Sequence, residues 1–334
     1  MDAMCSKARL TYNDTKSHVL DEHSRFSFTD NASGEADSIS ITLNNKDRRW
    51  LNRYYPKSGD YIKAWIDAFN WEADNDTQRM FCGRFMMDEI SFSGYPQQAE
   101  IKGISVPIRT NFNVTQKNKT WKKSSTKSIL SDLAKNGGLT LVYDADNHSI
   151  SEISQSGQSD LSFAFNLCSQ YDLSLKLYNN KMIVYDQSRY EKKQASFKLT
   201  QDNLRGDVSY NFTSQITQIY DSVKIQYTKD KKTLTYSYTI PGEKSNRTMF
   251  ITSKADSYKE AEIKAKAKLR ENRRSSKKLT LRNLVGSPEY LAAQNFELEG
   301  FGKIDGKYFI EKVTHDKSET GWTCSITAHP VVTF

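Results

Sequence analysis

The stretch Ile39-Ser40-Ile41-Thr42-Leu43 places an apolar side chain at every second residue and a hydroxyl side chain between them. This period of two is typical of a β-strand with one buried and one solvated face, because successive side chains of a strand point to opposite faces. The same alternation occurs at Phe26 to Phe28, Tyr61 to Ile66, Phe81 to Phe92 and Ala99 to Val106. The first hundred residues therefore predict an antiparallel β domain.

Strand-like sequence returns after about Ser196. Alternating runs lie at Val223 to Tyr227, Leu234 to Tyr238, Phe296 to Phe301, Tyr308 to Val313 and Thr323 to Ala328. The segment Tyr308 to His315, followed by a turn and Thr323 to Ile326, resembles Phe85 to Phe92 followed by a turn and Ala99 to Ile101. This likeness predicts that the two β regions arose by duplication.

The chain between the β regions, from about Ser124 to Asp186, carries a helix-strand pattern that repeats at an offset of 34 residues. Placing Leu139 on Leu173 also places Ser125 on Ser159. Both serines are suited to cap a helix, since their hydroxyls can accept hydrogen bonds from free backbone N–H groups of the first turn. Two copies are too few for a solenoid, so we expect one small α+β domain.

The strand and turn spacing fits barrels or sandwiches. The expected fold class is mainly β with an α+β insert, in which two related β-barrel domains flank a small helix-strand repeat domain. The expected domains are a first barrel at 1–110, the α+β domain at 111–195 and a second barrel at 196–334 with an inserted basic helix. The capping box Ser257-Tyr258-Lys259-Glu260 opens that helix, which we expect to run to about Asn272. At roughly 150 residues per domain, 334 residues accommodate two or three domains.

The formal net charge of +8 is concentrated in one segment. From Lys259 to Arg282 the chain has ten Lys and Arg residues and three Glu residues. A local basic segment is typical of one solvated helix face, or of a contact with an acidic neighbour. The candidate interface residues in this segment are Lys264, Lys268, Arg273, Arg274 and Lys277.

No arrangement typical of catalysis or metal binding stands out in the sequence. The four cysteines lie far apart without C-x-x-C spacing, and the five histidines are scattered. Gly157-Gln158-Ser159 lacks the second glycine of a nucleophile elbow. Adjacent Asp88 and Glu89 point to opposite faces of a strand, so they cannot flank one substrate atom without a bulge. We therefore expect no cofactor and no enzymatic activity, and a peptidoglycan hydrolase is the least favoured function.

Single-stranded nucleic-acid binding is the alternative function. The chain has 39 aromatic residues, the triplet Trp121-Lys122-Lys123, and the basic run Arg270 to Lys278, a combination of the kind that stacks bases and neutralises phosphates. Most of the aromatic residues occupy strand positions, where core packing accounts for them. No run approaches the roughly 18 apolar residues of a membrane-spanning helix, and Met1 to Cys5 lacks the pattern of a signal peptide.

The order of several short motifs resembles a known family. Gly34 to Leu43 and Gly59 to Ala64 look like the first domain of baseplate hub proteins, and Gly300 to Ile310 and Gly321 to Thr323 are similar to their last barrel. These hubs form the late-control-D-like family of contractile phage tails, prophage particles and R-type bacteriocins.

The resemblance implies a structural baseplate hub: a homotrimer in which two barrels per subunit form a six-fold-like ring from three chains. Such a ring adapts a six-fold tail tube to a three-fold spike.

The implied partners are a second and third copy of the chain, the tail tube protein, the central spike protein and other baseplate proteins. DNA would only pass through the channel, if the particle is a phage and not a headless bacteriocin. The implied location is the bacterial cytoplasm during assembly and then the baseplate of an extracellular tail particle. Because the sequence ends just after the last barrel, at His329 to Phe334, any wall hydrolase is expected on a separate polypeptide.

Overall fold

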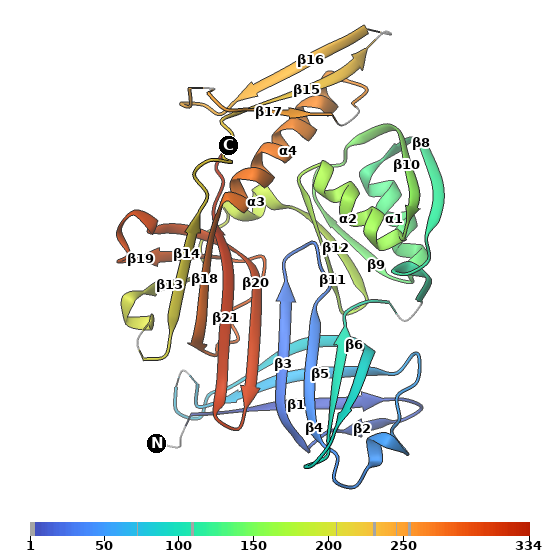
Figure 1. Cartoon of the computed structure of the whole chain (residues 1–334), viewed down its shortest axis with the longest axis vertical. Helices are drawn as coiled ribbons and strands as arrows, with labels where there is room; N and C mark the ends of the chain where they lie inside the picture. Colours follow the sequence, from blue (N-terminus) through green and yellow to red (C-terminus); the bar gives the residue numbers. More distant parts are fainter. Residues whose placement is uncertain are drawn as a thin grey trace.

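The structure is a computed structural model, and it describes residues 4–71, 73–107, 110–204, 206–229, 232–244, 246–252 and 255–334. Within these residues the protein is mainly β, with one large sheet, three small sheets and four α-helices. The large sheet lies at one end of the molecule, and the helices gather toward the other end (Figure 1).

The first β region forms one half of the large sheet. Its strand order is β3-β4-β7-β6-β5-β1-β2, with every neighbouring pair antiparallel. The apolar residues of the Ile39 to Leu43 stretch are buried and the hydroxyl residues between them are half-buried, as the alternation predicted. The elements are β1 (Cys5–Asn13), β2 (Ser17–Val19), β3 (His23–Asn31), β4 (Ser38–Asn44), η1 (Arg49–Leu51), β5 (Tyr61–Phe69), β6 (Thr77–Ser93), β7 (Gln98–Ile104) and η2 (Thr110–Phe112).

The last β region forms the other half of the same sheet. Its strand order is β14-β18-β21-β20-β19-β13, antiparallel except for the parallel pair β13 and β19. The elements are β13 (Phe197–Thr200), η3 (Gln201–Leu204), β14 (Ser209–Ser214), β18 (Lys277–Val285), β19 (Asn295–Glu299), η4 (Gly302–Ile304), β20 (Gly306–Ser318) and β21 (Gly321–Pro330).

An insertion between β14 and β18 carries a small mixed sheet and the basic helix. The sheet is β15 (Ser222–Lys229), β16 (Lys232–Thr239) and β17 (Thr248–Ile251), and α4 (Tyr258–Ser276) packs on it. Ser257 caps α4 by accepting from the backbone N–H of Glu260 at 3.2 Å. The helix continues four residues beyond the expected end at Asn272, because Arg273 and Arg274 find acidic partners inside the molecule.

The middle segment contains the predicted repeat. Ser125 and Ser159 cap α1 and α2, accepting from backbone N–H groups at 3.3 and 3.2 Å, and Gly138 ends α1 at φ 68°. The strands after the two helices differ: β9 pairs with β12 in parallel, and β11 pairs with it antiparallel. The elements are β8 (Lys117–Ser125), α1 (Thr126–Gly137), β9 (Thr140–Asp144), β10 (Ser149–Gln158), α2 (Asp160–Gln170), β11 (Leu173–Tyr178), β12 (Lys181–Asp186) and α3 (Gln187–Lys192).

The two β regions are not two separate closed barrels, and this part of the predicted fold is wrong. β20 pairs with β3, so both regions share one sheet, whose hydrogen-bonded path among the described strands is open at β14 and β2. One hydrophobic core runs through both regions. The mainly β class with an α+β insert is confirmed, while the boundaries at 110 and 195 stay a prediction.

Candidate assembly interface

The two β regions contain the same five-strand unit. We call β3, β4, β5, β6 and β7 the first unit, and β14, β18, β19, β20 and β21 the second unit. Both place their strands, numbered by order in the chain, as first, second, fifth, fourth and third across the sheet, and all neighbours are antiparallel. A shared order with shared directions supports the duplication that the hairpin motifs predicted.

The register of the strands makes the match residue-specific. The β6–β7 ladder shifts between Met87 and Glu89, and the β20–β21 ladder shifts between Ile310 and Lys312. Asp88 and Glu311 are therefore the extra residues of two equivalent β-bulges. The register also aligns Phe26-Ser27-Phe28-Thr29 of β3 with Tyr210-Asn211-Phe212-Thr213 of β14, since both segments pair with equivalent residues of β4 and β18.

The chain joins its two units through one strand junction. Beyond the bulge, Lys312–Ser318 of β20 leaves β19 and pairs with Arg25–Asn31 of β3. The rings of His315 and Phe28 stack there, with centroids 5.7 Å apart and planes 13° apart. The hydroxyl oxygens of Thr314 and Thr29 are 3.3 Å apart. This junction joins the second unit of the chain to its first unit.

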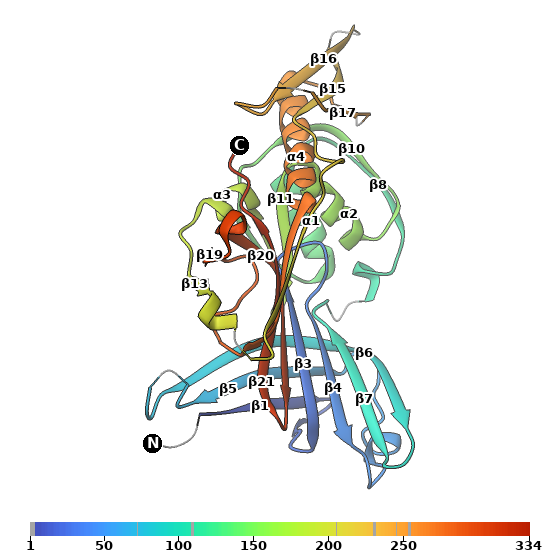
Figure 2. The same ribbon diagram turned by 60° about the vertical axis from the view of Figure 1, so that its left-hand side comes forward.

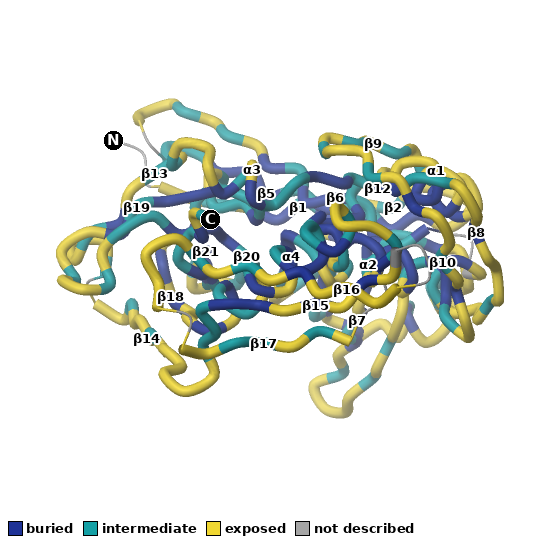
Figure 3. The backbone as a smooth tube through the Cα atoms, turned by 90° about the horizontal axis from the view of Figure 1, so that it is seen from above, coloured by how far each residue is buried: buried dark blue, intermediate teal, exposed yellow. Residues whose placement is uncertain are grey.

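The junction joins the edge of β20 to the edge of β3. Their counterparts, the edge of β6 in the first unit and the edge of β14 in the second, are open. β5 pairs with β6 only as far as Met86, so residues 89–93 of β6 pair with β7 alone, and β14 pairs with β18 alone within the described chain. Tyr210 of β14 is 53% exposed, and Figure 3 shows β14 as an exposed strand. Unpaired strand edges are templates for pairing with another chain.

The face of the shared sheet that points away from the core is polar. We call it the hydroxyl face. Its charged side chains include ion pairs of Lys102 with Glu89 at 3.0 Å and of Arg25 with Asp316 at 3.1 Å, and the Ser40 hydroxyl donates to Glu100 at 3.0 Å. The face is defined by Ser27, Thr29, Ser38, Ser40, Thr42, Ser91, Thr280, Thr314, Thr323, Ser325 and Thr327, which alternate with buried residues.

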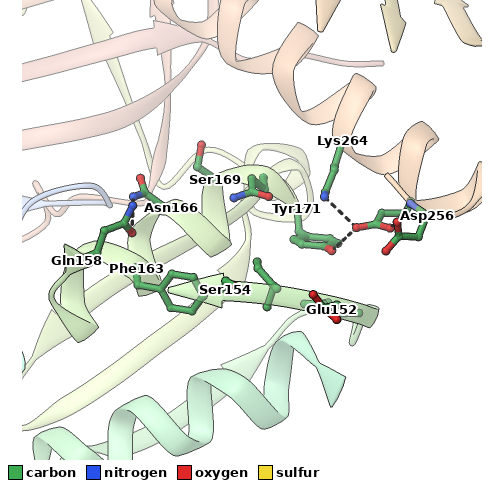
Figure 4. A pocket seen from close by; sticks show the side chains of 13 residues that line it. Glu152, Ser154, Gln158, Phe163, Asn166, Ser169, Tyr171, Asp256 and Lys264 are labelled. Atoms are coloured by element: carbon green, nitrogen blue, oxygen red, sulfur yellow. Dashed lines mark hydrogen bonds and ion pairs between the residues drawn. The ribbon is translucent and has the colours of Figure 1, made fainter. Parts of the chain in front are cut away.

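A cleft of about 500 Å³ lies between β10, α2 and the start of α4 (Figure 4). One carboxylate oxygen of Glu260 accepts from the Tyr171 hydroxyl at 2.9 Å and from Lys264 at 2.8 Å. The other accepts from the backbone N–H of Asp256 at 2.9 Å. Burial alone would raise the pKa of Glu260, but these donors outweigh it and leave the pKa lowered. The carboxylate is thus held ionised as a structural contact between the middle segment and α4.

The five candidate interface residues fall into two groups. Lys264 and Arg274 are buried, and Arg273 is half-buried with Asp221 at 3.0 Å. Lys268 and Lys277 are exposed, and Lys268 pairs with Glu271 at 2.9 Å. Much of the basic segment therefore meets acidic partners of its own chain. A role for the five residues in binding a partner stays a prediction.

Arg274 belongs to a buried ionic cluster that anchors α4 to the rest of the molecule. Its guanidinium binds Glu191 of α3 and Asp172, each at 2.5 Å. Glu191 also contacts His329 at 3.3 Å, and the other ring nitrogen of His329 lies 2.9 Å from Glu311. Burial alone would lower the pKa of His329, but the two carboxylates outweigh it and leave that pKa raised. The sequence did not suggest this cluster, because its members are far apart along the chain.

The residues weighed for catalysis have structural roles. A bulge does occur at Asp88, but Asp88 and Glu89 are exposed and Glu89 is bound by Lys102. Ser159 caps α2. Trp121 is 7% exposed and stacks on Phe163 at 5.1 Å, so it offers no free ring to a nucleic-acid base. In the described residues, no group of three or more His, Cys, Asp or Glu is placed to hold a metal ion.

None of the described helices is long and apolar enough to cross a membrane.

Comparisons with known proteins give no match to a family model and no match to a curated sequence. Solved structures do match. The tail protein from Neisseria meningitidis MC58 is similar at a TM-score of 0.71 and 13% identity, covering 96% of this chain and 96% of that one. The prophage MuSo2 43 kDa tail protein from Shewanella oneidensis is similar at 0.70 and 12%, covering 97% and 98%.

A third match is the E. coli c3393 protein, described as a component of the type VI secretion system with structural similarity to the T4 bacteriophage tail proteins gp27 and gp5. Its TM-score is 0.59 at 12% identity, covering 97% of this chain and 77% of that one. At these identities the matches establish the fold. They confirm the resemblance to tail proteins that the sequence motifs indicated: the chain has the fold of phage and prophage tail proteins.

Proposed function

We propose that the protein is the structural baseplate hub of a contractile tail or R-type bacteriocin. In this proposal three chains form a ring that joins a six-fold tail tube to a three-fold spike. The supporting observation is the repeated five-strand unit. Three chains contribute six such units, so a three-fold assembly can present an approximately six-fold surface.

The hydroxyl face lines the bore of the proposed ring. β1 and β5 run across β3 and β4 (Figure 2) and contribute buried residues to the shared core, so much of the first unit lies on the core side of the sheet. Units in a closed ring place their bulkier side outward, where the circumference is larger. Paired charges and hydroxyl groups then face the channel, which suits passage of a cargo without binding it.

The proposed partners are two further copies of the chain, a tail tube protein, a central spike protein and other baseplate proteins. The proposed role is structural and not catalytic, with assembly in the bacterial cytoplasm and a final location in an extracellular tail particle. Lys268 and Lys277 are the exposed members of the candidate interface set and are proposed as contacts for acidic neighbours.

Light scattering of the purified chain tests the trimer. The expected mass is three times 38.3 kDa. A mass of one chain, both alone and with the spike protein of the same particle, contradicts the proposal. A muralytic assay on the same sample tests the non-catalytic role, because wall cleavage by the purified chain would contradict it.

A further inference from the structure

We propose that residues 89–93 of β6 in one chain pair with β14 of a second copy of this chain. The pairing is antiparallel and has the register of the β20–β3 junction that each chain already contains. This inference rests on the proposed ring and specifies the contact that closes it.

The in-chain junction is the template. β20 offers the edge that lies beyond its bulge, and β3 offers its outer edge. In the repeated unit, β6 is equivalent to β20 and β14 is equivalent to β3. Each chain therefore uses one copy of each edge internally. It leaves the other copy of each edge open, with the bulge-side edge on the first unit and the outer edge on the second.

The two open edges are complementary in length and kind. Residues 89–93 of β6 and Ser209–Ser214 of β14 are both short, largely exposed segments in which polar and apolar residues alternate. Each lacks a backbone partner on its outer side among the described residues. Open ends of opposite type join head to tail, and such heterologous joining closes a ring when the rotation at each junction is suitable.

The equivalences fix the register. Thr314 and Thr29 correspond to Ser91 and Thr213, so these two residues are expected to face each other across the junction. The stacked pair of His315 and Phe28 corresponds to Phe92 and Phe212.

The predicted contacts are chemically suitable. Phe92 and Phe212 are half-buried within single chains and pack against the margin of the core. A cross-strand aromatic pair would cover both rings and extend the core across the junction. Ser91 and Thr213 are exposed hydroxyl residues that continue the hydroxyl face from one chain to the next.

Disulfide trapping tests this register. The variant Ser91→Cys with Thr213→Cys is made in a Cys5→Ser background, because Cys5 is the exposed native thiol and the other three cysteines are buried. The template residues lie directly opposite each other with hydroxyl oxygens 3.3 Å apart, and residues directly opposite in an antiparallel pair bring their β-carbons close enough for cysteines to be cross-linked. Oxidation is expected to give covalent dimers and closed trimers on a non-reducing gel. A mixture of the two single variants is expected to stop at dimers.

Two matched variants serve as controls. Thr29→Cys with Thr314→Cys is expected to form a disulfide inside one chain, which checks the template. Ser91→Cys with Ser209→Cys moves one partner by four residues, about 13 Å along the strand. It is expected to cross-link at least about tenfold less, because cysteines so far apart cannot be bridged.

The outcomes separate this contact from the ring itself. A trimer whose Ser91 and Thr213 positions cross-link no more than the shifted pair overturns the strand pairing and leaves the hub proposal standing. A chain that stays monomeric and does not cross-link overturns both. Trimers trapped by the Ser91 and Thr213 pair, and not by the shifted pair, support both.

Discussion

The two five-strand units share a topology but differ in what borders their bulged strand. In the second unit, Lys312–Ser318 of β20 lies against β3. In the first unit, residues 89–93 of β6 have no such neighbour within the described chain. The same edge is thus satisfied internally in one copy and left open in the other. This difference is the basis of the proposal that a second copy of the chain extends the sheet at the open edge.

The units also differ in the connection between their first two strands. Residues 32–37 connect β3 to β4, whereas residues 215–276 connect β14 to β18 and carry α4 with its small sheet. Only the second unit therefore needs an anchor for a long insertion, and the ionic cluster around Arg274 provides it.

Removing the anchor is expected to have the largest effect. Glu191→Ala leaves Arg274 and His329 without their shared carboxylate in a buried site. Loss of one partner from a buried ion pair costs about 3–5 kcal/mol of unfolding free energy. Urea titration measures it.

The exposed pair of Lys268 and Glu271 on the same helix is the control. Glu271→Ala is expected to cost only about 0–1 kcal/mol, because an exposed pair is screened by water. Equal losses in the two variants would show that the cluster does not anchor α4.

A second comparison concerns equivalent positions in the two bulged strands. His315 of the second unit corresponds to Phe92 of the first. Burial lowers the pKa of His315 to about 4 from 6.5. The unfolded chain therefore takes up a proton below pH 6.5 while the folded chain does not. Stability is lost as the pH falls from 6.5 to 4, by about 3 kcal/mol in total.

His315→Phe makes the second unit resemble the first and is expected to remove this acid sensitivity. The readout is the slope of unfolding free energy against pH between 6.5 and 4. It is distinct from the contribution of His329, whose raised pKa causes loss of stability as the pH rises. An unchanged acid slope in the variant would contradict the assignment.

A smaller loss of stability is expected from a substitution at the contact between Trp71 of the first β region and the second β region. The indole N–H of Trp71 donates to the carbonyl of Gly286 at 2.8 Å, and its ring packs on Trp322 with centroids 5.2 Å apart. A β-carbon at Gly286 would lie 2.2 Å from the Trp322 ring. Gly286→Ala is therefore expected to cost about 1–3 kcal/mol through overpacking. Thermal unfolding measures it, and Gly94→Ala, where a β-carbon meets open space, is the neutral control.

The hydroxyl face gives the prediction with the least effect on folding. Glu89→Gln, Glu100→Gln and Asp316→Asn together remove carboxylates that neutralise this face and leave Lys102 and Arg25 without their partners. The variant is expected to bind single-stranded oligonucleotides at low salt, with affinity that falls as salt rises, whereas the parent protein does not bind.

A matched variant carries the same charge change on the middle segment: Asp144→Asn, Asp146→Asn and Glu152→Gln. It is expected to bind much less, because its cations do not gather around one channel. Tight binding by the parent protein would instead favour the single-stranded nucleic-acid alternative.

The parts of the fold that local chemistry determines were predictable from the sequence. The serine caps of α1, α2 and α4 follow from side chains that satisfy backbone N–H groups a few residues away. The two similar hairpins were recognised from their alternation, and their bulges fall at equivalent residues.

What the sequence did not reveal depends on contacts between distant residues. The match of Phe26 to Thr29 with Tyr210 to Thr213 is only four residues long and becomes visible once strand partners are known. The β20–β3 junction joins residues nearly 300 positions apart and replaces the expected closed barrels. Arg274 looked like a surface cation because Glu191, which neutralises it, lies 83 residues away.

The most direct test of the repeating structure is negative-stain electron microscopy of the purified chain. The account predicts ring-shaped class averages with a central hole, the mass of three chains, and a three-fold outer rim, because only the second unit carries the insertion of residues 215–276. Compact particles without a hole, or rings with a number of chains other than three, would contradict the claim that the units of three chains form one ring.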